Sequence, residues 1–308
     1  MAAPPPRDWA VVVNPSKFDD LTAVKELVAR IARAHSWPEP RWYETTEQDP
    51  GTGQARQAVA DGAGLVCPLG GDGTVRCVAA GLLDAGVPLG LLPGGTGNLL
   101  ARNLGLPIDD LEAALAVAIT GTDAPVDAGL VAFDGAAPEV FLVMAGMGLD
   151  AQTVGGATVE LKRQLGWFAY AVSGIRSVLR AGFRVSVRAG DQRAFTQHAA
   201  TVMIGNCGEL TGGMKLMPAA KVDDGLLDAV VVSPRSLGAW LAVGVYILTR
   251  NRFGHSAIAH LVGPDITVTA AKPIAAQLDG DAVGTATRLV CSVRAGALRV
   301  RVPAASGL

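Results

Sequence analysis

The stretch LGGDGTVRCVAAGLLDAGVPLGLLPGGTGNLLARNLGLP, residues 69–107, contains two glycine clusters, GGDGT at 70–74 and GGTGN at 94–98. Each cluster ends a strand-like apolar run and precedes a helix-like run. In an open parallel sheet, ligands bind beyond the carboxyl ends of the strands. Glycine allows sharp turns and close backbone approach, and the amides at a helix start favour phosphate. The two clusters therefore predict neighbouring loops that bind one polyphosphate from two sides.

Each cluster alone is equally well explained as a tight strand-to-helix turn. Their matched placement and the polar residues within them favour phosphate binding; these are Asp72, Thr74, Thr96 and Asn98. The first loop is not a dinucleotide fingerprint, because Arg76 occupies the third glycine position, and no Walker GxxxxGK[ST] motif occurs.

The first third of the chain alternates strand signals with helix signals around these loops. Apolar or β-branched runs typical of strands occupy residues 8–13, 41–46, 64–70 and 87–93. Helix signals occupy residues 19–34, 54–63, 74–86 and 98–106, and Asp19 or Asp20 is placed to cap the first helix. This alternation predicts an α/β domain with a parallel sheet and helices on its faces.

The pattern changes near residue 126, where short strand-like runs separated by turn-rich spacers begin. These runs cover residues 126–135, 139–148, 183–191, 198–206, 226–234, 265–273, 274–283 and 289–303. They predict a mostly antiparallel β-sandwich or barrel, with helical interruptions at 159–180 and 236–249. We therefore expect two domains, residues 1–125 and residues 126–308.

The composition indicates which classes of binding partner and which cellular compartment suit this chain. The 308 residues carry a formal net charge of −2, which argues against a nucleic-acid partner. The four cysteines form no CxxC pair and read as buried thiols in a reducing compartment. The first residues lack the layout of a signal peptide, and the longest apolar run, at 237–249, is shorter than the ~20 residues that cross a bilayer. We expect a soluble, cytoplasmic protein without a transmembrane segment, and its positive mean hydropathy leaves contact with a membrane surface open.

Five segments together resemble the catalytic domain of the diacylglycerol kinase family, which includes soluble bacterial lipid kinases and the related sphingosine kinases. The segments are VVVNPSK (11–17), GGDGT, PGGTGNLLARNLGLP (93–107), IGNCGELTGGMKLMPAAKVDDGLLDAVVV (204–232) and QLDGDA (277–282). GGDGT alone is shared with NAD kinases, but all five in order are specific. The resemblance implies an α/β domain like those of NAD kinases and diacylglycerol kinases, followed by a mostly antiparallel β-sandwich domain.

The resemblance also implies which residues bind ATP. The family's nucleotide contacts fall on Asn14, Pro15, Ser16, Lys17, Thr45, Gly71, Asp72, Gly73, Thr74 and Thr96, beside Asn98 of the second loop. Where the family's first loop continues into Asn and Glu, this chain has Arg76 and Cys77.

Several carboxylates are candidates for metal binding and proton transfer. Asp72 could hold a catalytic Mg²⁺ beside a bound phosphate, or cap the following helix. Asp279 and Asp281 would share one face of an extended segment, although the residues alone favour a D-G turn there. The resemblance implies that Asp281 is the proton acceptor in place of the family's Glu, with Asp279 sharing the task. It also implies a second, structural Mg²⁺ at Lys221, Asp224 and Leu226, where the alternative is an exposed acidic turn.

These features predict an ATP- and Mg²⁺-dependent lipid kinase that phosphorylates the hydroxyl of a diacylglycerol-like lipid at the membrane surface. The alternatives are an NAD kinase and a nucleotide-binding regulator that has lost catalysis. The basic, apolar helix expected around Trp167 could lie on an anionic bilayer, but the residues favour ordinary core packing with a solvated basic face. The sequence does not decide whether the protein forms a homodimer. No GxSxG motif or spaced histidine pair supports a hydrolase or redox reading.

Overall fold

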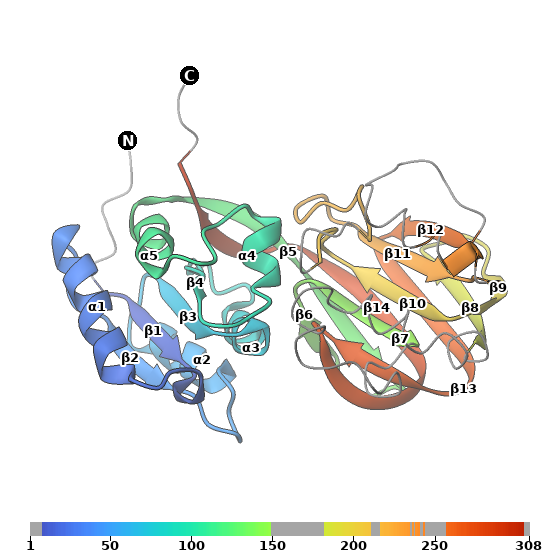
Figure 1. Cartoon of the computed structure of the whole chain (residues 1–308), viewed down its shortest axis with the longest axis horizontal. Helices are drawn as coiled ribbons and strands as arrows, with labels where there is room; N and C mark the ends of the chain where they lie inside the picture. Colours follow the sequence, from blue (N-terminus) through green and yellow to red (C-terminus); the bar gives the residue numbers. More distant parts are fainter. Residues whose placement is uncertain are drawn as a thin grey trace. The chain divides into compact units, whose positions relative to one another are not determined.

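The computed structural model of the chain describes residues 8–148, 182–210, 216–234, 236, 238–240, 243 and 257–304. They form two compact units, one of Met1–Ala128 with Ala295–Leu308 and one of Gly129–Arg294 (Figure 1). The helix expected at 159–180 lies outside the described residues, as does most of the one expected at 236–249. In the part of the chain that the structure describes, no helix is both long and apolar enough to cross a bilayer.

The first unit is built on a parallel sheet, as expected from the sequence, and its strand order is β2-β1-β3-β4. The strands are β1 (Ala10–Val13), β2 (Arg41–Glu44), β3 (Val66–Gly70) and β4 (Leu92–Pro93). The helices are α1 (Leu21–Ala34), α2 (Thr52–Ala60), α3 (Asp72–Leu82), α4 (Leu99–Asn103) and α5 (Leu111–Thr120), with a 3-10 turn, η1 (Pro15–Lys17). All four residues of β1 are buried, because helices cover both faces of a parallel sheet.

Local sequence explains where these helices begin and what they cover. Asp20, rather than Asp19, caps α1, since its carboxylate accepts a hydrogen bond from the Ala23 N–H at 2.9 Å. Asp110 caps α5 in the same way. Apolar side chains of α1 and α5 share one buried cluster with β1 and β3, so these two helices cover the same face of the sheet. Helix α5 was not predicted from the sequence.

The second unit contains the mostly antiparallel β-sheet expected of a β-sandwich. Within the described residues the strand order is β12-β11-β10-β7-β13-β14-β5-β6, with β8 added on β13 and β9 on β8. The strands are β5 (Thr122–Phe133), β6 (Glu139–Phe141), β7 (Met144–Gly148), β8 (Phe183–Ala189), β9 (Phe195–Ala199), β10 (Thr201–Gly205), β11 (Leu227–Val232), β12 (Ile258–Gly263), β13 (Asp265–Leu278) and β14 (Asp281–Val302). The first part of β13 pairs with β8 and its last part pairs with β7. Its pairing with β14 shifts register between Thr269 and Ile274 and again between Ala276 and Gln277. The inward side chains of these strands form one buried apolar cluster.

The last residues of β14 return to the first unit. The Leu89 N–H donates to the Arg299 carbonyl at 2.7 Å, and the Arg301 N–H donates to the Leu89 carbonyl at 2.9 Å. The Arg301 guanidinium also lies 3.0 Å from the Asp123 carboxylate. Residues 295–302 therefore pack with the first unit, although the expected division at residue 125 placed them with the second. Strand β14 runs continuously across this change of unit, and the local signal there is Gly296, which has a φ of 59° and whose N–H donates to the Asp127 carboxylate at 2.7 Å. A single glycine in a strand does not by itself predict that the chain changes unit.

Candidate active site

The two glycine loops are in direct backbone contact at the carboxyl ends of β3 and β4. The Gly94 N–H donates to the Gly70 carbonyl at 3.1 Å. A Cβ atom at Gly95 would lie 2.6 Å from the Gly71 Cα, closer than real Cβ atoms approach. Only glycine therefore allows the two loops to meet at this position.

Three side chains fix the second loop. The Asp72 carboxylate, at the start of α3, accepts from the Leu99 N–H at 2.6 Å, which joins the starts of α3 and α4. Asn98 adopts a left-handed conformation with a φ of 47°, donates to the Gly95 carbonyl at 2.9 Å and accepts from the Gly95 N–H at 3.3 Å. The Arg102 Nε donates to the Gly97 carbonyl at 2.8 Å. The loop is thus rigidly held before any ligand binds.

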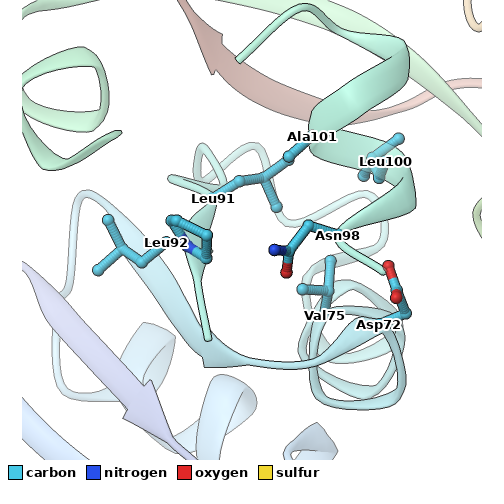
Figure 2. A pocket seen from close by; sticks show the side chains of 8 residues that line it. Asp72, Val75, Leu91, Leu92, Asn98, Leu100 and Ala101 are labelled. Atoms are coloured by element: carbon cyan, nitrogen blue, oxygen red, sulfur yellow. The ribbon is translucent and has the colours of Figure 1, made fainter. Parts of the chain in front are cut away.

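Asp72 and Asn98 line a small pocket in the first unit. Figure 2 shows both polar side chains among apolar ones, and the lining is Asp72, Val75, Leu91, Leu92, Pro93, Asn98, Leu100 and Ala101.

The other predicted nucleotide residues lie at the same edge of the sheet. In the ladder, Val13 at the end of β1 pairs with Glu44 of β2 and Leu69 of β3, and Gly70 pairs with Pro93 of β4. The four strands therefore end together, and every predicted nucleotide residue follows one of these ends; they are Asn14, Pro15, Ser16, Lys17, Thr45, Gly71, Asp72, Gly73, Thr74, Thr96 and Asn98.

These residues differ in how firmly the fold fixes them. The Asn14 carboxamide accepts from the Ser16 N–H and hydroxyl, at 3.1 and 2.7 Å, and so begins η1. Thr45 and Thr74 are buried, whereas Ser16, Lys17 and Thr96 are exposed and available to a ligand.

The LDGD segment forms the two-residue turn between β13 and β14. Asp279 and Gly280 have φ values of 46° and 92°, and Leu278 pairs with Asp281 across the turn. Asp279 is 5% exposed, and its carboxylate accepts from the N–H groups of Leu142, Val143 and Met144 at 3.0, 2.9 and 2.9 Å. Asp281 is exposed at the start of β14. The two carboxylates therefore do not share a face, because positive φ values replace the extended conformation that such sharing requires.

The predicted structural Mg²⁺ residues lie in the turn before β11. Lys221 and Asp224 are exposed, and the Asp224 carboxylate accepts from the Leu226 N–H at 3.1 Å. Asp228, which the sequence analysis missed, lies in β11 with 6% of its surface exposed. Burial, and then the nearby Asp224 carboxylate, raises the pKa of Asp228 to about 6. The only sequence signal for Asp228 was a charged residue inside an apolar strand.

The oxygen donors at both candidate metal positions suit Mg²⁺ chemically. Mg²⁺ prefers carboxylate, carbonyl, water and phosphate oxygens, and often takes only one or two protein carboxylates. Asp72 and Asp224 offer carboxylates, and Lys221 and Leu226 offer carbonyl oxygens. Among the described residues, no three His, Cys, Asp or Glu side chains gather into a protein cage. An ion at either position would therefore depend on phosphate, carbonyl or water ligands.

Comparisons with known proteins divide the chain into two domains. The family model for the diacylglycerol kinase catalytic domain matches residues 8–131, and the YegS C-terminal NAD kinase beta sandwich-like domain matches residues 142–302. A "probable lipid kinase YegS-like" of Pseudomonas aeruginosa is 32% identical over 255 residues, covering 82% of this chain and 81% of that protein. An uncharacterized Synechocystis protein, sll0036, is 32% identical over 235 residues, which are 74% of this chain. The match covers 53% of that relative, so this chain spans about half of its length.

Solved structures share the fold. The crystal structure of a diacylglycerol kinase from Bacillus anthracis str. Sterne has a TM-score of 0.70 and 24% identity, covering 96% of this chain and 97% of that chain. Another crystal structure from that organism reaches a TM-score of 0.78 at 24% identity, over 98% of this chain and 97% of that chain.

Proposed function

The chain belongs to the family of YegS-like lipid kinases with a diacylglycerol kinase catalytic domain, and we propose that it transfers the γ-phosphate of ATP to the hydroxyl of a diacylglycerol-like lipid. The observation that carries the proposal is the pair of touching glycine loops where the parallel strands end together. Family membership favours this reading over an NAD kinase.

The first unit would bind the triphosphate of ATP. The first turn of α3, which begins at Asp72, presents N–H groups that no earlier helical turn can accept, and the positive end of the helix dipole adds to their attraction for phosphate. The second loop lies against the first, and its shape is set by Asp72, Asn98 and Arg102. Because these loops are already ordered, little conformational entropy is lost when phosphate binds.

Mg²⁺ would be held at Asp72 with phosphate oxygens, and a second ion at Asp224 with the Lys221 and Leu226 carbonyls. A bound Mg²⁺ neutralises phosphate charge as the phosphoryl group moves. The structural support for these positions is the oxygen chemistry of the residues.

Asp281 would act as the general base. As the lipid hydroxyl oxygen attacks the γ-phosphorus, the bond from that phosphorus to the bridging oxygen breaks and ADP leaves. The hydroxyl proton passes to the Asp281 carboxylate, which is exposed as a base must be to reach a substrate.

Incubation of the purified protein with γ-labelled ATP, Mg²⁺ and micelles of diacylglycerol, monoacylglycerol or sphingoid base tests this proposal. Label should appear in the lipid fraction, most of it with diacylglycerol. The matched variant Asp281→Asn should lose at least ~100-fold in kcat while its ATP affinity stays within about twofold. A folded protein that binds ATP but labels no lipid would support the alternative of a nucleotide-binding regulator without catalysis. Label in NADP would support the alternative of an NAD kinase.

A further inference from the structure

Three consecutive buried N–H groups lie where β6 passes into β7: those of Leu142 and Val143 in the connection and that of Met144, the first residue of β7. Leu142, Val143 and Met144 are each at most 4% exposed. The Asp279 carboxylate accepts from all three N–H groups, one oxygen from Leu142 and the other from Val143 and Met144. Unsatisfied buried N–H groups are costly, so this one carboxylate completes the hydrogen bonding of the connection.

The carbonyl oxygens of residues 142–144 are equally fixed. The Val143 carbonyl accepts from the Asn206 N–H at 2.9 Å, and the Leu142 carbonyl accepts from the Cys207 thiol at 3.3 Å. The Met144 carbonyl accepts from the Asp279 N–H at 2.8 Å. The LDGD turn is thus bonded through both backbone and side chain to a segment more than 130 residues earlier.

The same turn sets where Asp281 lies. Only Gly280 separates Asp281 from Asp279, and both turn residues have positive φ values. The Gly280 N–H donates to the Gln277 side-chain oxygen at 2.9 Å, which fixes the turn from its other side. A shift of the Asp279 carboxylate would therefore move Asp281, and a displacement of about 1 Å at a reacting group can cost about 10²-fold in rate.

A carboxylate in the environment of Asp279 is poorly suited to accept a substrate proton. Its oxygens face three backbone donors, and protonation would disrupt those hydrogen bonds. It is 5% exposed, whereas Asp281 is exposed.

We propose that Asp279 is a positioning residue, which anchors residues 142–144 and thereby places Asp281, and that it does not take the substrate proton. The proposal rests on the proposed function of Asp281 as the base. We call Asp279 and the backbone of residues 142–144 the Asp279 anchor.

Hydrogen exchange tests the anchor without any need for activity. The exchange of the Leu142, Val143 and Met144 amides is followed in the full chain by mass spectrometry with fragmentation. Asp279→Asn replaces an acceptor oxygen with an NH₂ group and should speed this exchange at least tenfold, while Asp281→Asn should leave it unchanged. Wild-type protection in Asp279→Asn would overturn the anchor.

Kinetics test the positioning role. Asp279→Asn should lower kcat ten- to hundredfold but keep the acid limb of the pH–rate profile, which Asp281→Asn should abolish. In a double-mutant cycle, the double variant should be no slower than Asp281→Asn, because a positioning effect disappears with the residue that is positioned. Loss of the acid limb in Asp279→Asn alone, or a double variant slower by the full Asp279→Asn factor, would overturn the role.

Two further variants serve as controls for these experiments. Asp134 has a φ of 48°, and its carboxylate accepts from the Thr287 N–H, the Thr287 hydroxyl and the Arg288 N–H in the same unit. Asp134→Asn should therefore lower the melting temperature without altering the pH–rate profile. A changed profile would mean that weakening any turn of this unit alters catalysis, and it would count against a specific positioning role for Asp279. If Asp279→Asn fails to fold, Gln277→Ala removes the bond to Gly280 within the turn, together with the 3.5 Å contact between the Gln277 amide and the Met203 sulfur. It should lower kcat with the acid limb retained, and an unchanged kcat would count against positioning.

The two proposals can fail separately. Rapid exchange in Asp279→Asn together with no lipid phosphorylation by the wild type would overturn the assignment of Asp281 and support the anchor alone. Lipid phosphorylation that Asp279→Asn leaves unchanged would overturn the positioning role and support the proposed function.

Discussion

At the scale of single residues, the candidate aspartates of the two units differ in the groups that surround them. The Asp279 carboxylate accepts from three backbone N–H groups, and the Asp72 carboxylate accepts from the Leu99 N–H. Asp281 is exposed, whereas Asp228 is buried near another carboxylate. Identical side chains in one chain therefore differ in burial, in hydrogen-bond donors and in pKa, and the roles proposed for them follow these differences.

Substitutions of Asp72 should separate its structural contact from its charge. Asp72→Asn can still accept from the Leu99 N–H, so its free energy of unfolding should stay within about 1 kcal/mol of wild type, while kinase activity falls at least ~100-fold for lack of a metal carboxylate. Asp72→Ala should lose the same activity and also about 1–3 kcal/mol of stability. Denaturation curves beside kinase assays check this, and an active Asp72→Asn would refute metal binding there.

Asp228 predicts a particular dependence of stability on pH. Its folded-state pKa of about 6 lies above the ~3.9 of an unfolded aspartate, so folding favours the protonated form. Its contribution is fully present below about pH 4 and is lost as pH rises through 6. In metal-free buffer, Asp228→Asn should match wild type at pH 4 and be more stable by roughly 2 kcal/mol at pH 7.5. Thermal melts at pH 4, 6 and 7.5 measure this, and a difference independent of pH would contradict it.

Residue patterns predicted the site only in part. Glycines and polar residues at strand ends were visible because each chemical type appears directly in the sequence. The anchoring of residues 142–144 by Asp279 was not visible, because it depends on a contact across more than 130 residues.

At the scale of elements, the contact between the two glycine loops predicts a contrast between neighbouring glycines. Gly95→Ala would place a methyl group 2.6 Å from the Gly71 Cα, so the loops must separate; we expect a loss of about 1–3 kcal/mol and at least tenfold weaker ATP binding. Gly71→Ala is the matched control, because its Cβ meets nothing closer than 3.9 Å and its φ is −86°. Its stability should be close to wild type. Urea denaturation and ATP titration of both variants check the contrast, which fails if both are equally stable.

The elements themselves were largely predictable. The four strands of the first unit and the D-G turn between β13 and β14 carry strong local signals, namely β-branched runs and turn dipeptides. Helix α5 was missed because its sequence, LEAALAVAIT, is apolar on most sides and so has little helical periodicity.

At the scale of the whole molecule, the two units are not successive segments of the chain. Strands β5 and β14 both run from one unit into the other, and the first unit includes residues on both sides of the second. Sequence patterns located the β-rich region. They did not predict that residues 295–302 belong to the first unit, because a pairing between residues far apart in the chain is not encoded in a local pattern.

A chain that ends after Arg294 should therefore have a destabilised first unit. It lacks Leu298 and Val300, which are 2% and 0% exposed, and the Arg301 contact with Asp123. Burial of two such side chains contributes roughly 3–6 kcal/mol, a large share of the stability of a typical domain. We expect loss of ATP binding and of the cooperative melting of this unit. A chain that ends after Pro303 keeps β14 whole and is the control; ATP binding by the shorter chain would contradict the prediction.

The return of β14 also affects the order in which the protein can fold while it is being made. A ribosome releases the chain from its amino end, and an amino-terminal domain usually folds first. Here the unit that emerges first lacks a strand until residues 295–302 have left the exit tunnel. During synthesis its apolar edge beside Leu89 would stay uncovered, so newly made chains should depend on chaperones until the last strand arrives.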